Sequence, residues 1–189
     1  MKTKAVLFAF ALSGVSVFGQ GVVTFQNSAI STPIKWDPTG GVDYVNIPAG
    51  GQLFSFYFKY GSSLQYTSQT YFNNDALAGR ITTIGTADIV LPNAPGGVAT
   101  SFQLFGFSTA AGSFENAKCS IFAVWYQSSI ITATPSVSPT PGYPLFGVSQ
   151  GSQFQGFNFH PAIDPCPEPS TIALGVLGAG SLLFFRRRK

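Results

Sequence analysis

The amino-acid sequence predicts an all-β fold, an antiparallel β-sandwich of jelly-roll-like type, with one short apolar segment at each end of the chain. Phenylalanine recurs at every second position in Gln52-Leu-Phe-Ser-Phe-Tyr-Phe-Lys59, which is the pattern of a half-buried strand. Glycine-rich turns at 40–41, 49–51 and 95–97 separate runs of this kind. No segment between them has the 3.6-residue apolar period of a long helix, so a parallel α/β fold is disfavoured.

Seven segments are predicted to be strands, in chain order 22–25, 42–47, 52–59, 81–91, 100–107, 121–126 and 154–159. Residues 74–80 and 113–118 are each predicted to form one short helical turn. Four prolines among serines and threonines mark residues 132–144 as a long surface connection inside the domain. A mucin-like glycosylated spacer is the alternative, which is less favoured because strand-like residues resume at Leu145 and Phe146.

Residues 1–19 predict a secretory signal peptide. The cationic start Met1-Lys-Thr-Lys4 precedes an apolar run that ends at Gly19 and contains only two serines. Small or branched residues before the junction place the cleavage between Gly19 and Gln20, so the mature chain is expected to begin at Gln20. An uncleaved membrane anchor is the alternative, which the short run disfavours.

The C-terminus has the pattern of a stop-transfer segment. Residues 171–185 carry no charge, and four cations follow, Arg186, Arg187, Arg188 and Lys189. Such cations stay in the cytoplasm, so the preceding domain lies outside. At about 1.5 Å per residue the run spans roughly 22 Å, less than the roughly 30 Å bilayer core, which suits a temporary transmembrane helix. A buried C-terminal helix, the alternative, would end beside unpaired cations.

A proline-rich stalk at 160–170 joins the domain, residues 20–159, to this helix. Residues 166–189 resemble the PEP-CTERM sorting signal of Gram-negative envelope proteins. The resemblance is carried by Pro167-Glu168-Pro169 with the following Ser-Thr, by Ala173-Leu174-Gly175 and by the basic end. It implies recognition by an exosortase, a membrane-embedded cysteine transpeptidase-like enzyme. The implied route runs from the secretory translocon through the inner membrane to the cell surface or an exopolysaccharide matrix.

Charge excludes one class of function. The chain has a sequence pI of about 9.0, but six of its ten cations lie in the two terminal signals. Residues 20–169 contain only Lys35, Lys59, Arg80 and Lys118 against seven acidic residues, a net charge of −3. Nucleic-acid binding, which needs clustered cations on the folded domain, is therefore not expected.

We predict no catalytic residue, metal site or cofactor, and hence no enzyme. The single histidine, His160, falls in the predicted stalk, where no rigid frame holds it beside a nucleophile. One histidine and two separated cysteines cannot form a zinc tetrad. A secreted glycoside hydrolase is the less favoured alternative, because its two carboxylates would have to come from Asp37, Asp43, Asp75, Asp88 and Glu115, which adjoin predicted turns.

Carbohydrate binding is a further alternative, since flat aromatic faces stack on sugar rings. Trp36, between Lys35 and Asp37, is the best candidate for a glycan contact, and packing at the edge of the core is the competing interpretation.

Cys119 and Cys166 are the only cysteines. In the oxidising space outside the cell they could pair and fasten the stalk to the domain, whereas a buried free thiol at Cys119 is the alternative.

Overall fold

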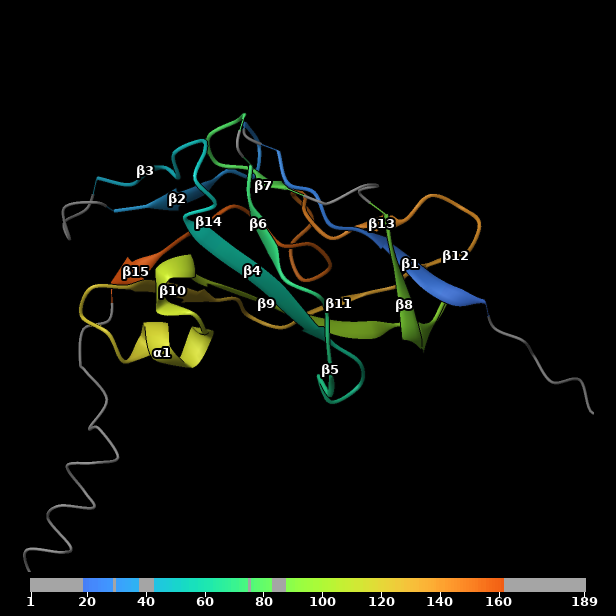
Figure 1. Ribbon diagram of the computed structural model, residues 1–189. Coiled ribbons are helices and arrows are strands. Elements are labelled where there is room, and N and C mark those ends of the chain that lie inside the picture. The colour runs from blue at the N-terminus through green and yellow to red at the C-terminus, as the bar shows by residue number, and fades with distance from the viewer. Residues whose placement is uncertain (1–18, 29, 38–42, 75, 83–87, 162–189) are drawn as a thin grey trace, which may run out of the picture.

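The computed structural model describes residues 19–28, 30–37, 43–74, 76–82 and 88–161, which form a β-rich domain of three sheets (Figure 1). Residues 1–18 and 162–189 lie outside this description, and with them the body of the predicted signal peptide, most of the stalk, the membrane helix and the basic tail. Within the described ranges, no helix has the length and apolar character needed to cross a bilayer.

The largest sheet has eight strands and is organised around two long neighbours, β4 (Phe54–Tyr60) and β9 (Thr100–Ser108). They pair antiparallel from Phe54 opposite Ser108 to Tyr60 opposite Phe102. The sheet continues outward from β9 through β10 (Val124–Gln127) to β15 (His160–Pro161), and from β4 through β6 (Tyr71–Asn73) to β7 (Ile81–Thr82). β5 (Tyr66–Thr67) pairs with β4, and β11 (Ile131–Ala133) pairs with β9.

Two smaller sheets lie against this one. In the first, β1 (Gln20–Thr24) has β8 (Asp88–Pro95) along one edge, and β12 (Ser136–Val137) and β13 (Tyr143–Pro144) along the other. In the second, β2 (Ile34–Trp36) lies between β14 (Phe157–Asn158) and β3 (Val45–Asn46). The segment predicted as a plain surface connection therefore supplies two short strands that cover the edge of β1.

The predicted all-β class with mainly antiparallel pairing is confirmed. The arrangement differs from the jelly-roll-like expectation in having three sheets, and two pairings, β1 with β13 and β2 with β14, are parallel. Parallel neighbours cannot be joined by a tight hairpin and need a long crossover connection. Each of these pairs joins strands more than a hundred positions apart in the sequence, so the returning chain can approach in either direction.

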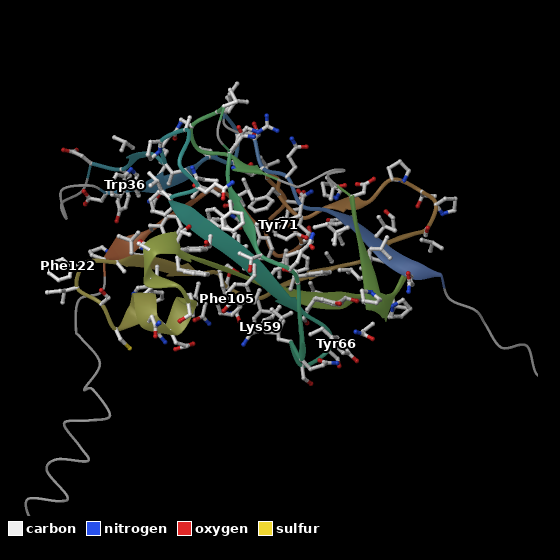
Figure 2. The ribbon with its side chains drawn as sticks, in the orientation of Figure 1. Trp36, Lys59, Tyr66, Tyr71, Phe105 and Phe122 are labelled. Carbon is white, nitrogen blue, oxygen red and sulfur yellow. The ribbon has the colours of Figure 1, made fainter. Side chains whose placement is uncertain are left out.

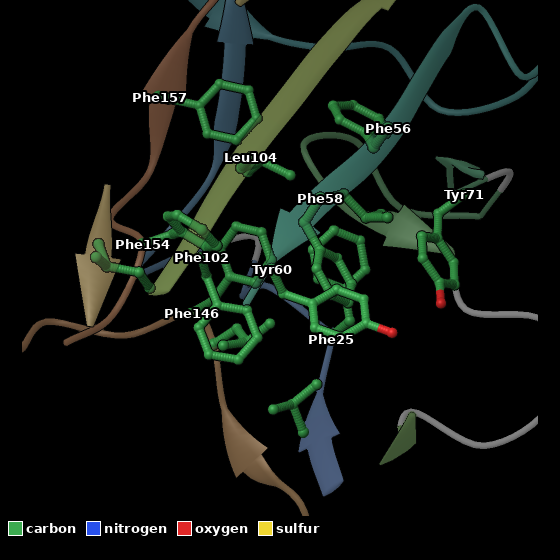
Figure 3. Close-up of a cluster of buried hydrophobic side chains, with 14 of the residues drawn as sticks. Phe25, Phe56, Phe58, Tyr60, Tyr71, Phe102, Leu104, Phe146, Phe154 and Phe157 are labelled. Atoms are coloured by element: carbon green, nitrogen blue, oxygen red, sulfur yellow. The ribbon is translucent and has the colours of Figure 1, made fainter. Parts of the chain in front are cut away.

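The core lies between the large sheet and the two small ones and consists mainly of phenylalanine rings (Figure 3). The alternating side chains of β4 point into it, as the sequence predicts, and Phe56 and Phe58 are fully buried. Gly106 on β9 makes room for the rings, since a Cβ there would lie 2.9 Å from Cζ of Phe159 and 3.1 Å from Cε1 of Phe56. Close ring packing of this density explains why a small residue occupies that position.

The opposite face of the large sheet has a smaller apolar cluster under the helix α1 (Phe114–Lys118), which follows the 3-10 turn η1 (Thr109–Ala111). Ser113 caps α1 by accepting a hydrogen bond from the Asn116 N–H at 3.2 Å. Phe114 then packs edge-on against Phe105 of β9, with ring centroids 5.0 Å apart. The short turn predicted at 113–118 is thus present, and it allows β9 to bury side chains on both faces.

The domain extends slightly beyond the predicted boundary at residue 159. His160 and Pro161, which we assigned to the stalk, form β15 and pair with Trp125 and Val124 of β10. The His160 ring also makes an edge contact with Tyr44, at 6.4 Å between centroids. At the other end β1 begins at Gln20, directly after the predicted cleavage position, which stays a prediction.

Candidate functional site

A groove opens between the edge of the large sheet and β8 of the first small sheet. It has a volume of about 380 Å³, within the range of about 300–1,000 Å³ of small-molecule sites. Tyr60, Tyr71 and the connection 67–69 form one wall, and Asp88 with residues 89–92 forms the other. The groove therefore lies at a junction of two sheets, lined mainly by polar groups.

The most unusual group in this groove is the hydroxyl of Tyr71. The residue is 1% exposed, and its ring packs against Phe25 with centroids 4.8 Å apart. In Figure 3 its hydroxyl points away from the cluster of rings. Burial raises the pKa of Tyr71, and a hydrogen-bonding contact with the Gln69 side chain partly opposes this effect. The hydroxyl oxygen is buried, and its contact with Gln69 falls outside full hydrogen-bonding geometry, so the hydroxyl is only weakly satisfied, which is a cost for a buried polar group.

The connection beside Tyr71 is held in place by Ser68. Its backbone N–H donates to the Phe58 carbonyl at 2.8 Å, and its hydroxyl accepts from the Phe58 N–H at 3.0 Å. The same hydroxyl donates to the Gln69 carbonyl at 2.8 Å. These bonds fix the groove wall to β4, so the Gln69 and Tyr71 side chains are presented from a rigid segment.

Asp88 supplies the charge of the opposite wall. One of its carboxylate oxygens accepts a hydrogen bond from the Thr24 hydroxyl, which also donates to the Gly142 carbonyl at 3.1 Å. Since Asp88 is paired with Thr24 across β1 and β8, its position is set by the sheet as well as by this bond. The pairing of β1 with β8 and the hydrogen bond from Thr24 therefore hold the Asp88 carboxylate in one position.

The walls of the groove combine hydrogen-bond donors with hydrogen-bond acceptors. Tyr71, Gln69 and Asp88 combine a hydroxyl, an amide and a carboxylate, which together donate and accept. The groove is poorly suited to stacking, because the rings of Tyr60 and Tyr71 are almost entirely buried. Among its described lining residues Asp88 is the one carboxylate, whereas glycoside hydrolysis by the usual mechanism uses two.

Trp36, the predicted glycan contact, lies in β2 and does not line this groove; Figure 2 labels it apart from Tyr71. It is half-buried and packs edge-on against Phe54, with centroids 5.8 Å apart. The side chain therefore contributes to the edge of the core, and a role in glycan binding stays a prediction.

In the described part of the chain, no three His, Cys, Asp or Glu side chains gather as a metal site.

Cys119 follows α1 directly and is disulfide-bonded. Its predicted partner, Cys166, lies outside the described residues, so the pairing of these two residues is retained as a prediction. His160 is in β15, where it contacts Tyr44, and it does not line the groove. The structure therefore does not bring the histidine together with Tyr71 or Asp88.

The sequence reasoning did not select Tyr71, Gln69 or Asp88 as site residues. Tyr71 lies in a strand of only three residues, too short to show an alternating pattern. Asp88 is named in the sequence analysis only among the possible carboxylates of the less favoured glycoside hydrolase, because an acidic residue beside a turn is usually solvated. The polar stretch Ser68-Gln69-Thr70 before an aromatic residue is the one local signal that could have indicated this wall. No local signal could have indicated β8 as the opposite wall.

The sorting-motif residues Pro167, Glu168 and Pro169 and the basic residues 186–189 lie outside the described residues. Comparison with known protein families finds that residues 165–189 match the family described as PEP-CTERM protein-sorting motif. No curated protein and no solved structure matches the chain. The chain therefore carries a PEP-CTERM sorting motif, which implies export and processing by an exosortase.

Proposed function

We propose that this chain is an envelope or matrix protein that is anchored in the inner membrane only while it is being sorted. Residues 1–19 direct it to the secretory translocon, and residues 171–185 then hold it in the membrane. An exosortase cuts near Pro167-Glu168-Pro169, and the domain passes to the cell surface or an exopolysaccharide matrix. The match of the sorting motif at residues 165–189 carries this proposal.

The domain fits such a route because its ends suit processing on both sides. β1 begins directly after the predicted signal-peptide junction, and β15 ends at Pro161, nine residues before the apolar run. Cleavage in either flanking segment would leave every described strand intact. We further propose that the domain acts without catalysis, supported by the single described carboxylate in its groove.

The test replaces Pro167, Glu168 and Pro169 together by alanine in the full chain. We expect export to persist, while an unprocessed form that retains the membrane segment accumulates in the inner membrane. Pro165→Ala is the matched control, since it removes a neighbouring proline and leaves the motif intact. Intact-mass analysis of membrane, surface and medium fractions distinguishes the forms. Normal release of the triple variant would refute exosortase sorting through these residues.

Carbohydrate binding is a second candidate function, favoured by the Tyr71 hydroxyl. A buried hydroxyl whose one contact, with Gln69, is weak gains a better hydrogen bond when a ligand supplies one, and sugar hydroxyl groups both donate and accept. The adjacent Gln69 and Asp88 offer further contacts in the same groove. The ligand would be a segment of exopolysaccharide held mainly by hydrogen bonds.

The test measures binding of the host's purified exopolysaccharide by the processed protein. Tyr71→Phe removes only the hydroxyl, so the fold should persist while affinity falls roughly 3- to 10-fold, the value of one hydrogen bond. Tyr57→Phe, on the other face of the same sheet, is the control. Loss of binding in Trp36→Ala but not in Tyr71→Phe would move the site to β2. Absence of binding would leave a structural role, and release of reducing sugar would refute the non-enzymatic assignment.

A further inference from the structure

The turn after α1 exposes two neighbouring apolar side chains, which we name the apolar tip: Ile121, 59% exposed, and Phe122, 93% exposed. The turn is ordered by Ser120, whose hydroxyl accepts from the Phe122 N–H at 3.3 Å and whose carbonyl accepts from the Ala123 N–H at 3.0 Å. Aromatic residues are usually withdrawn from water, and adjacent exposed apolar residues on a fixed turn indicate a contact surface.

The apolar tip lies at the end of the domain from which the chain continues toward its membrane segment. β10 begins two residues after Phe122, and its Val124 is paired antiparallel with Pro161 of β15. Because the two strands run in opposite directions, the chain at Pro161 is heading toward the side of β10 that bears the tip. Figure 2 shows Phe122 at this end of the molecule.

The tether between the domain and the membrane segment is short. Nine residues, 162–170, separate β15 from the apolar run that begins at Thr171. At about 3.3 Å per residue they span at most roughly 30 Å. If Cys119 pairs with Cys166, which is one of the two alternatives that the sequence leaves open, only the four residues 167–170 would remain, with a reach of about 13 Å. The tip would then be held close to the bilayer surface.

The surroundings of the tip resemble those of residues at membrane interfaces. Lys118 ends α1, three residues before Ile121, and its ammonium lies 5.7 Å from the ring centroids of both Phe114 and Trp125. Glu115 lies 3.9 Å from the same ammonium and offsets part of its charge. The tip is therefore flanked in the sequence by a cation and a tryptophan, a combination typical of segments that rest in the headgroup region.

We propose that the apolar tip enters the outer leaflet of the inner membrane while the chain is anchored. The domain then rests on the bilayer beside its own tether, which presents the sorting motif at headgroup level to a membrane-embedded enzyme. This inference rests on the transient anchoring proposed above. The occupant of the apolar tip is a phospholipid surface, and a second copy of the chain is the alternative that the test must exclude.

The experiment reconstitutes the full chain in vesicles of phosphatidylethanolamine and phosphatidylglycerol, with the photoreactive analogue benzoylphenylalanine in place of Phe122. The matched control carries the analogue in place of Ile30, which is also 93% exposed but lies between β1 and β2 in the other layer of the domain. Resistance to carbonate extraction first establishes that the tail is inserted. Mass spectrometry then measures lipid adducts, and we expect at least five-fold more from position 122 than from position 30.

Equal, low lipid labelling at both positions with an inserted tail would refute the apolar tip as a lipid contact and leave the anchoring intact. A tail that carbonate extracts would instead refute the anchoring itself. Adducts between two protein chains in place of lipid adducts, increasing with the protein-to-lipid ratio, would show that a second copy covers the tip and would also overturn the proposal. Hydrogen exchange provides an independent measurement. In the vesicle-bound chain, the double substitution of Ile121 and Phe122 by serine should reduce the protection of the backbone amides of residues 120–123. Unchanged protection would contradict it.

Discussion

Replacing Phe58 by alanine should strongly destabilise the domain, because this ring occupies the centre of the core. Phe58 has 0% exposure. Its ring centroid lies 5.0 Å from that of Phe25, 5.9 Å from that of Tyr60 and 6.1 Å from that of Phe102. Phe25 directly follows β1, whereas Tyr60 and Phe102 lie in β4 and β9, so the ring joins the first small sheet to the large one. Removing it leaves a cavity that the two sheets can close only by moving together.

The expected loss is about 4 kcal/mol of unfolding free energy, since a Phe→Ala change in a core costs about 3–5 kcal/mol in transfer and cavity terms. The matched control is Phe122→Ala, the same substitution at a side chain with 93% exposure. Surface changes of this kind usually alter stability by no more than about 0.5 kcal/mol. For a domain of about 150 residues, 4 kcal/mol corresponds to a decrease in Tm of about 12 °C.

Urea unfolding of residues 20–169, followed by the fluorescence of Trp36 and Trp125, measures both variants. This fragment is expected to fold alone, because every described strand lies within it. A cooperative transition with an unchanged slope and a lower midpoint would attribute the change to native-state stability. A loss below about 1 kcal/mol for Phe58→Ala, or equal losses at positions 58 and 122, would refute the assignment of this core.

Four further outcomes are expected. Asn27→Ala should cost about 3 kcal/mol in urea unfolding, because the buried Asn27 amide donates to two backbone carbonyls and its oxygen accepts from a backbone N–H. Asn27→Asp should not restore stability, because a carboxylate oxygen would face those two carbonyl oxygens in place of the amide N–H groups. Full recovery in Asn27→Asp would contradict this account. Gly106→Ala should cost about 1–3 kcal/mol by overpacking, and a stabilised variant would show that the neighbouring rings can move. Burial raises the pKa of Tyr126, so the folded state retains a proton that the unfolded chain loses near pH 10. The free energy of unfolding should therefore be unaffected by this group below pH 10 and decline above it. Tyr126→Phe should weaken that decline. If Cys119 and Cys166 pair, alkylation of the unreduced protein should modify neither residue, and Cys119→Ser should expose one reactive thiol. Reduction should lower the free energy of unfolding by up to about 4 kcal/mol. A reactive thiol in the native protein would disprove the pairing.

Local patterns were sufficient to predict the class of fold and the sorting motif near the C-terminus. Alternating phenylalanines in β4 place one face in a core whatever the partner strand is, because side chains of a strand alternate between its faces. The short turn at 113–118 also follows from a local cap, Ser113. Sorting signals are read by other proteins as linear segments, so the C-terminal motif was recognisable without any tertiary structure.

The remaining features depend on contacts between distant segments, which no local pattern encodes. Strand order, the parallel pairing of β1 with β13 and the addition of β15 to the sheet follow from how the long connections return. The groove exists because β8 lies opposite β6, which brings Asp88 near Tyr71. The same reason explains the apolar tip: sequence shows that Ile121 and Phe122 are apolar, but only the packed fold decides which apolar residues are left in water. Burial is a property of the assembled layers, whereas periodicity and sorting motifs are properties of the chain itself.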